Sequence, residues 1–236
     1  MSHPDDAPPR LPDPKAIREK LVDALRDVII SGRLKPGARI REPELVTLLG
    51  VSYSPLREAV RILEGEGFIV SRCHRGAARV SELSAADLRD MMHLRVMLEH
   101  VAAGLVLERL DDALTAILAD QVARARAAAR RGDSTTTFTL AVEFHDLLVG
   151  ACGNRKAVQL HENLKAHQRR YDHFAFARIG RNVRPVDDHE QIVGALRRRD
   201  LTAVQHLLRA HLLRFYDSVA PLLPVASGFP DPPAHT

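Results

Sequence analysis

Residues 42–80 read EPELVTLLGVSYSPLREAVRILEGEGFIVSRCHRGAARV, and this segment specifies the fold of the first part of the chain. A short helix fits residues 42–49, because the leucines recur at helical spacing and a glycine follows. Ser54 and Pro55 are typical of a helix start, since serine can cap free amides and proline at the first helical position loses no hydrogen bond. The sequence therefore predicts a second helix from this point to residues 65–67.

Two short strands are predicted after these helices, and another helix before them. Residues 68–72 and 77–80 have strand composition around a turn at residues 73–76. Upstream, apolar residues recur at helical spacing from Ile17 to Ile29. The order helix, helix, tight turn, helix and β-hairpin is that of a winged helix-turn-helix, which we assign to residues 15–80.

The shape of a winged helix-turn-helix suits it to DNA. Its third helix can enter a major groove about 12 Å wide with its N-terminal residues leading, while the hairpin tip reaches the backbone or the minor groove. Arg57 could then bind a guanine edge or a phosphate, and both remain open. A helix-turn-helix also occurs in protein-interaction modules, which is the alternative interpretation. The candidate DNA-binding residues are Arg41, Tyr53, Ser54, Arg57, Arg61, His74, Arg75 and Gly76.

Charge is distributed unevenly along the 236 residues, whose net charge is +4. Residues 15–80 hold 13 Lys and Arg against 8 Asp and Glu, whereas residues 81–236 hold 20 against 19. Ten of the twelve histidines lie in this second part. Because a basic segment can bind a polyanion, the pattern indicates two domains with different partners.

The second part is expected to be an all-helical domain over residues 81–220. Short loops between its helices predict an antiparallel bundle, so the fold class is mainly α. The Pro-rich segments 1–14 and 221–236 are expected to be a disordered leader and a disordered tail. The six predicted helices span residues 84–110, 111–131, 134–151, 155–179, 185–199 and 201–220.

Composition restricts the class of protein and its location. With 45% hydrophobic and 27% charged residues, the chain is of the globular type. It has no run of about 18 uncharged apolar residues, and its first residues lack the basic and then apolar pattern of a secretory signal. Cys73 and Cys152 match no metal-finger spacing. We therefore expect a cytoplasmic protein without disulfides and without a membrane partner.

Three histidines are predicted to point into the bundle from three different helices. His145, His189 and His211 each share a helical stripe with apolar residues. An unpartnered buried imidazole would cost about 1–3 kcal/mol, and a shared divalent metal would satisfy all three rings. Three His ligands with open positions suit zinc, nickel or a similar transition ion. Most histidines in helices are instead surface or core residues, and this interpretation is given to His93, His100, His161, His167, His173 and His206.

Arg95 is a further candidate, because it shares a helical stripe with Leu88 and Met92 and is expected to point inward. A buried guanidinium needs an anion. A carboxylate effector beside the metal is one choice, and an ion pair with Glu99 one turn later is the other. Both stay open at this point.

These motifs carry a family resemblance. The segments ELVTLLGVS, SPLREAV, LEGEGF and HRG between residues 44 and 76 resemble the DNA-binding domain of GntR-family transcriptional regulators. The segments LRVMLE, FH, GN, HEQI and RAHL between residues 94 and 212 are similar to the FCD effector domain of the FadR subfamily. The resemblance covers about residues 15–220.

The resemblance implies a regulator rather than an enzyme. Members are homodimeric, usually repressing, bind a palindromic operator in double-stranded DNA and respond to a small organic acid. In metal-binding members, one Asp and three His hold the cation. For this chain, that implies His145, His189 and His211 as metal ligands and Arg95 as an effector-binding residue.

Two departures from the family pattern change these expectations. Ala141 stands where the Asp ligand is expected, one turn before His145, which leaves a three-His site or no metal. Tyr53 stands where the family usually has Arg, and the family often has a basic residue near Pro43. The operator sequence is therefore expected to differ from the common half-site.

Two other functions compete with transcriptional regulation. A metal-dependent hydrolase could use the three histidines to activate water, but no Asp or Glu accompanies them in a motif such as HExxH. A metal-storing or scaffolding bundle would leave the winged helix-turn-helix without a role.

Overall fold

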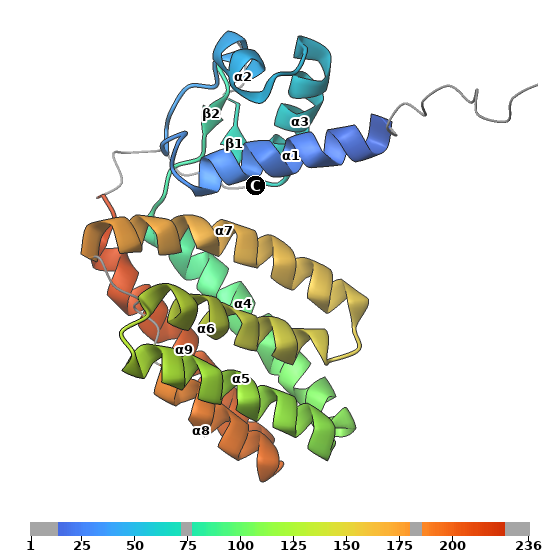
Figure 1. Cartoon of the computed structure of the whole chain (residues 1–236), viewed down its shortest axis with the longest axis vertical. Coiled ribbons are helices and arrows are strands. Elements are labelled where there is room, and N and C mark those ends of the chain that lie inside the picture. The colour runs from blue at the N-terminus through green and yellow to red at the C-terminus, as the bar shows by residue number, and fades with distance from the viewer. Residues whose placement is uncertain (1–13, 72–76, 180–185, 225–236) are drawn as a thin grey trace, which may run out of the picture. The chain divides into compact units, whose positions relative to one another are not determined.

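The structure, a computed structural model, describes residues 14–71, 77–179 and 186–224. The chain divides into two compact units, residues 1–82 and residues 83–236 (Figure 1). The predicted hairpin tip, the leader up to residue 13 and the tail from residue 225 lie outside the described residues. Each unit is described by itself below.

The first unit is built from helices packed around a small core. It contains helices α1 (Pro14–Ile30), α2 (Glu42–Leu49) and α3 (Tyr53–Gly65) and strands β1 (Ile69–Val70) and β2 (Arg79–Val80). Leu25, Leu56, Leu63 and Phe68 are almost completely buried in its core. This order of elements is the predicted winged helix-turn-helix.

The turn between α2 and α3 sets the start of the third helix. Gly50 ends α2 in the left-handed region, at φ 65°, where a glycine carries no steric penalty. Helix α3 then begins at Tyr53 with Ser52 as its N-terminal cap residue, so the predicted cap at Ser54 is wrong by two residues. Pro55 is tolerated at the third helical position because an amide there would have no partner within the helix.

The hairpin is shorter than predicted. Its strands pair antiparallel with Ile69 opposite Val80 and Val70 opposite Arg79. The backbone amide of Phe68 instead closes the end of α3, bonding to the carbonyl of Leu63 at 2.9 Å. The carbonyl of Ala78 accepts from the amide of Ile40 at 2.8 Å, so part of the second strand pairs outside the hairpin.

The second unit is the predicted helical bundle (Figure 1). Ser84 caps the first helix by accepting from the amide of Asp87, and three aspartates cap later helices in the same way. The bundle reaches past its predicted end at residue 220, because Leu223 is buried after a 3-10 turn at Ala220–Leu222. Its helices are α4 (Ala85–Arg109), α5 (Asp112–Arg130), α6 (Ser134–Gly150), α7 (Arg155–Ile179), α8 (Val186–Arg197) and α9 (Leu201–Val219).

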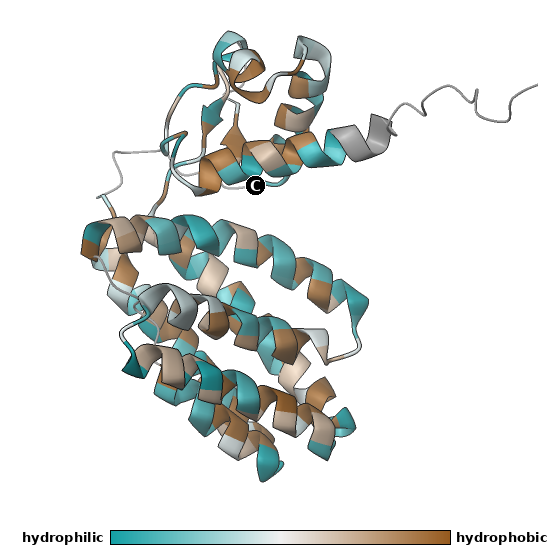
Figure 2. Cartoon of the chain, in the orientation of Figure 1, coloured by the Kyte–Doolittle hydropathy of each residue, from teal (hydrophilic) through white to brown (hydrophobic). Residues whose placement is uncertain are grey.

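A polar layer separates two apolar cores in this unit. Along α4, Leu88 and Met92 belong to one core and Ala102 and Val106 to the other. Between them lie Arg95 and Glu99, which are also buried. Along α9, His211 occupies the corresponding place between Leu208 and Phe215. The helices accordingly carry both apolar and polar stretches (Figure 2).

None of the helices in the described ranges is long and apolar enough to cross a membrane.

Candidate metal centre and nucleic-acid interface

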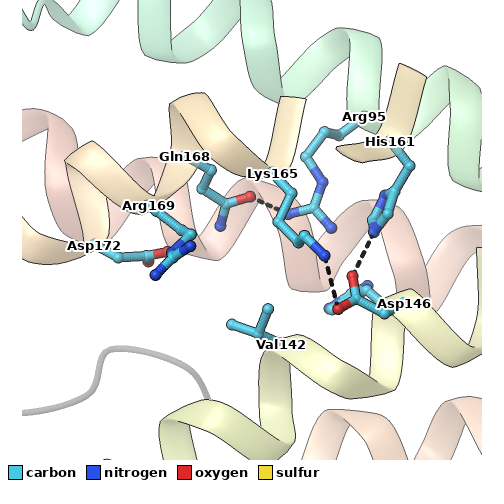
Figure 3. Close-up of a pocket in the computed structure, with 9 residues that line it drawn as sticks. Arg95, Val142, Asp146, His161, Lys165, Gln168, Arg169 and Asp172 are labelled. Atoms are coloured by element: carbon cyan, nitrogen blue, oxygen red, sulfur yellow. Dashed lines mark hydrogen bonds and ion pairs between the residues drawn. The ribbon is translucent and has the colours of Figure 1, made fainter. Parts of the chain in front are cut away.

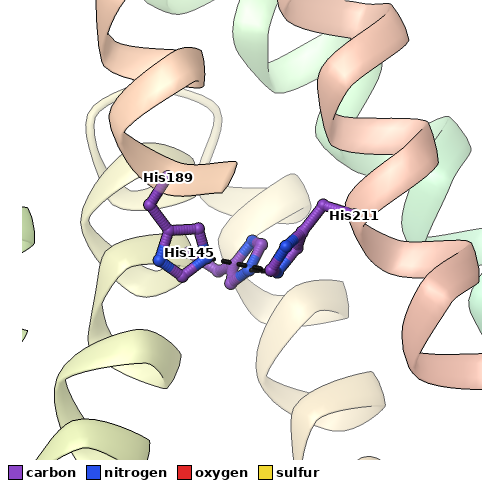
Figure 4. Close-up of side chains that lie close together, drawn as sticks. All are labelled: His145, His189 and His211. Atoms are coloured by element: carbon purple, nitrogen blue, oxygen red, sulfur yellow. Dashed lines mark hydrogen bonds between the residues drawn. The ribbon is translucent and has the colours of Figure 1, made fainter. Parts of the chain in front are cut away.

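Three histidine rings meet in the polar layer (Figure 4). His145 comes from α6, His189 from α8 and His211 from α9, and each is at most 3% exposed. Nε2 of His211 lies 3.2 Å from Nε2 of His145 and 3.1 Å from Nε2 of His189. Phe144 stacks on the His189 ring at 4.3 Å between centroids and so fixes its orientation. The structure thus brings together the three side chains that the apolar stripes single out.

Two of the three rings each have a carboxylate at Nδ1, on the side away from the cluster's Nε2 atoms. Nδ1 of His145 lies 2.7 Å from Oε2 of Glu99, and Nδ1 of His211 lies 2.9 Å from Oδ2 of Asp188. An ionised carboxylate only accepts hydrogen bonds, so Nδ1 of each of these two rings carries a proton and donates it. A ring with its only proton on Nδ1 keeps a lone pair on Nε2, so the 3.2 Å between Nε2 of His145 and Nε2 of His211 suits a cation shared by the two neutral rings.

The charges around the cluster keep these protonation states in place. Burial lowers the pKa of His145 to about 3, so its ring is neutral. Burial opposes the ionisation of Glu99, but Arg95 and His145 outweigh this effect and hold the pKa of Glu99 well below its ordinary value. Burial likewise opposes ionisation of Asp188, whose pKa is nonetheless lowered by hydrogen bonds from His211 and Arg214.

The donor set fits a divalent transition metal. A tetrahedral zinc ion with Zn–N bonds of about 2.0–2.1 Å separates two nitrogen ligands by about 3.3 Å, close to the two Nε2 distances in the cluster. Metal-ligating histidines commonly donate their other N–H to a carboxylate, as His145 and His211 do here. Ala141, fully buried on α6, supplies no carboxylate, so within the described part of the chain the fitting set is three histidines.

Arg95 forms the internal ion pair that was one of its two expected roles. One nitrogen of its guanidinium contacts Glu99, and another contacts the side-chain oxygen of Gln168 on α7. Arg95 also lines a pocket beside the histidine cluster (Figure 3). His145 lines the same pocket, so the ion pair does not exclude a role for Arg95 in holding a ligand.

The pocket is walled mainly by polar residues of α6 and α7. Asp146 accepts from Lys165 at 3.0 Å and lies 3.0 Å from Nε2 of His161. Burial opposes ionisation of Asp146, but these two contacts hold its pKa below the ordinary value. Lys165, Arg169 and Arg95 give the wall three cationic groups against the two carboxylates of Asp146 and Asp172, and this net positive charge suits an anionic ligand.

The first unit presents the predicted DNA-binding residues on its surface. Leu56, Ala59 and Leu63 turn one face of α3 into the core, which leaves Tyr53, Ser54, Arg57 and Arg61 exposed. Arg41, at the N-terminal end of α2, is exposed too and pairs with Glu44 at 2.9 Å. His74, Arg75 and Gly76 lie outside the described residues.

Arg57 makes a two-pronged contact with Glu42 at the start of α2. Its Nε lies 2.9 Å from Oε2 and 3.1 Å from Oε1 of that carboxylate, and its Nη2 lies 2.9 Å from Oε2. The hydrogen bonds that Arg57 donates to Glu42 raise the pKa of Arg57, so the guanidinium stays charged. The guanidinium also lies 5.9 Å from the centre of the Tyr53 ring.

Several residues of these sites were missed from the sequence. Asp188, Asp146 and Gln168 have no motif of their own, and their partners lie on other helices. His161 is 3% exposed, as one of its two interpretations, a packing residue, requires, but its place at the pocket was not foreseen. Its polar neighbours could have been suspected only if the pairing of α6 with α7 had been known.

Comparison with protein families assigns both parts of the chain. Residues 17–80 match the family "Bacterial regulatory proteins, gntR family", and residues 90–214 match the FCD domain. Among solved structures, Escherichia coli McbR/YncC has a TM-score of 0.70 at 21% identity, covering 87% of this chain and 98% of that one. A putative GntR regulator from Rhodococcus sp. RHA1 has a TM-score of 0.68 at 22% identity, covering 89% and 100%.

Curated relatives point the same way. The uncharacterized HTH-type transcriptional regulator YdhC of Bacillus subtilis is 29% identical, covering 86% of this chain and 90% of its own. The HTH-type transcriptional repressor RspR of Escherichia coli is 28% identical, covering 86% and 89%. A probable D-xylose utilization operon transcriptional repressor of Paenarthrobacter nicotinovorans is 29% identical, covering 86% and 90%.

Regulators of this family bind DNA and usually act as dimers. Because both parts of the chain match regulator families, the hydrolase and the scaffold are removed as alternative functions. The chain belongs to the GntR family, in the FadR-like subfamily with an FCD domain, and is a DNA-binding transcriptional regulator rather than an enzyme.

Proposed function

We propose that this regulator is a homodimeric repressor whose affinity for a palindromic operator changes when a small carboxylate binds its helical domain beside a divalent metal. The observation that carries this proposal is the pairing of the three-His cluster with a cationic pocket through a shared residue, His145. The names of relatives such as RspR support repression.

An apolar stripe on α4 supports the proposed homodimer. Leu94, Met97 and Val101 are 50%, 59% and 59% exposed, and their spacing places them on one face of the helix. Exposed apolar side chains gathered on one face are typical of protein interfaces. We assign this face to the dimer contact.

The proposed metal site would use Nε2 of His145, His189 and His211. When bound, the metal would supply positive charge that attracts an anion. Glu99 and Asp188 would hold two of the rings in the tautomer that binds a cation. Arg95 and Lys165 would add positive charge at the pocket wall, where the carboxylate enters.

Effector control requires a difference between two conformations. A ligand shifts the equilibrium between DNA-binding poses only by as much as it prefers one of them. The pocket is lined by α4, α6 and α7, so a ligand that contacts all three helices can favour one arrangement of the bundle. We propose that this arrangement is coupled to the pose of the two DNA-binding units in the dimer.

Selection from random duplex DNA with the full chain tests the DNA-binding part of the proposal. The selected sites should be palindromic, and Arg57→Ala should lower affinity for them at least about tenfold, because Arg57 can bind a guanine edge or a phosphate. The exposed Arg130 on α5 gives a matched control, and Arg130→Ala should bind as the parent does. Fluorescence anisotropy measures the affinity, and sedimentation should show the dimer in both variants.

Two results would contradict the assignment. Unchanged operator affinity in Arg57→Ala would remove α3 from the interface with DNA. A monomeric parent protein bound to sites without two-fold symmetry would remove the homodimer. A reporter carrying the selected site over its promoter then tests the sign, with lower expression expected when the regulator is present.

A further inference from the structure

Three residues at the pocket beside the histidine cluster each carry a buried polar atom without a hydrogen-bond partner among the residues the structure describes. The atoms are Nε of Arg95, Nε2 of Gln168 and Nδ1 of His161. All three residues line the pocket and are at most 3% exposed. Native proteins leave few buried polar groups unsatisfied, so three at one pocket point to a ligand that completes them.

Two of these atoms are hydrogen-bond donors. The two terminal nitrogens of the Arg95 guanidinium are engaged by Glu99 and by the oxygen of Gln168, which leaves its Nε–H. The oxygen of Gln168 is used in that contact, which leaves its NH2 group (Figure 3). Arg95 and Gln168 contact each other through the Gln168 oxygen, so both donors belong to the same part of the pocket wall and could each bind an oxygen of one carboxylate.

The third atom is an acceptor, because of the partner on the other side of the ring. Nε2 of His161 lies 3.0 Å from Oδ1 of Asp146, whose other oxygen accepts from Lys165. The ionised carboxylate can only accept, so in the neutral ring the proton is on Nε2. Nδ1 of His161 then carries a lone pair and needs a donor from the ligand.

We propose that the pocket selects a hydroxycarboxylate, in which the carboxylate accepts from Arg95 and Gln168 and a hydroxyl group donates to Nδ1 of His161. An ammonium group could donate as well, but the pocket wall holds the cations of Arg95, Lys165 and Arg169 against the carboxylates of Asp146 and Asp172, and this net positive charge disfavours a cation. This inference rests on the proposed effector function and narrows its ligand class. His145 lines the pocket too, so the ligand would lie next to the three-His cluster.

Calorimetry with the full chain, in the presence and absence of Zn²⁺, tests the proposal with pairs of acids that differ only in hydroxyl groups. The pairs are glycolate and acetate, lactate and propionate, 3-hydroxybutyrate and butyrate, and gluconate and hexanoate. At least one hydroxy acid should bind about tenfold or more tightly than its partner, because a site built around a hydroxyl group penalises its absence. Alanine, which carries an ammonium in place of the lactate hydroxyl, should bind no better than propionate.

Variants test separately the proposed contact with the hydroxyl group and the proposed contact with the carboxylate. His161→Leu should abolish the preference for the hydroxy acid while leaving the affinity for the plain acid unchanged. His161→Gln should retain part of the preference, since its amide can donate to Asp146 and still offer an oxygen. Gln168→Leu should weaken both members of a pair equally, and His206→Leu, at an exposed position on α9, should change neither. Circular dichroism establishes that each variant is folded.

The outcomes distinguish this inference from the proposed function. Equal affinities within every pair, or a preference that survives in both His161 variants, would overturn the hydroxycarboxylate assignment and leave carboxylate control intact. Binding of none of the eight acids would overturn both the assignment and the carboxylate effector. Recognition of DNA through Arg57 is tested separately and would stand.

Discussion

Arg57 and Glu42 in the first unit have side chains that are 62% and 34% exposed, whereas Arg95 and Glu99 in the second unit are 3% and 0% exposed. Both are Arg–Glu pairs, but their surroundings give them different consequences. Water can replace either partner of the exposed pair, so Arg57 can leave Glu42 for a DNA base or phosphate at little cost. Neither member of the buried pair can lose its partner without leaving an uncompensated charge.

This difference matches the roles proposed for the two units. The first unit holds its charged side chains ready at the surface, where a polyanion can reach them. The second unit holds them in the polar layer between two apolar cores, where only a small ligand or ion can reach them. Charged groups kept inside a helical bundle are costly, so their presence in this unit favours a binding role over a structural one.

The largest expected effect tests the buried pair directly. Glu99→Ala should destabilise the second unit by about 3–5 kcal/mol, because it leaves the Arg95 guanidinium buried without its carboxylate. Hydrogen exchange followed by mass spectrometry reads each unit separately, and protection should fall along α4. Glu42→Ala, which breaks the exposed pair, should leave protection in the first unit unchanged.

Replacing both members of the buried pair tests whether the lost stability comes from the unpaired charge. The double variant Arg95→Met and Glu99→Leu should regain most of the lost protection, since well-packed apolar residues often replace a buried ion pair without loss of stability. Equal protection in Glu99→Ala and the parent would show that the buried and exposed pairs do not differ in energy as their burial indicates.

The next effect concerns the metal. His189→Ala should lower the affinity for Zn²⁺ by more than about a hundredfold, because changes behind a metal ligand already cost about 10–100-fold and a ligand itself contributes more. Competition with a chelator of known affinity measures the change. His206→Ala, at an exposed site on α9, is the matched control. Equal zinc content in the two purified variants would eliminate the three-His site.

The helices and the three inward histidines could be predicted because apolar spacing within a helix is local information. Predicted ends of the six bundle helices lie within two residues of the observed ones. The start of α3 was misplaced because both Ser52 and Ser54 are good cap residues, and backbone conformation decides between them.

The carboxylates that contact the histidine rings could not be predicted in the same way. Glu99 meets His145 across 46 positions, and Asp188 meets His211 across 23. Asp188 directly precedes His189 in the sequence, yet its carboxylate contacts Nδ1 of His211, because α8 packs on α9. His161 lies on a polar face of α7 that becomes buried only when Asp146 of α6 covers it. Periodicity of apolar residues carries no signal for such a face.

The smallest expected effect returns to the exposed pair. Glu42→Gln should raise affinity for random-sequence DNA several-fold, because it removes a negative charge from the face proposed to meet phosphates and releases Arg57. The slope of log affinity against log salt should steepen by about one as Arg57 becomes able to neutralise a phosphate. Affinity for the selected operator should rise less, so the ratio of specific to random binding should fall. Glu108→Gln, on an exposed position of α4, removes the same charge elsewhere and should change neither quantity. If Glu42→Gln and Glu108→Gln bind random DNA alike, Glu42 does not restrain Arg57, and the exposed pair is no more available to DNA than the buried one.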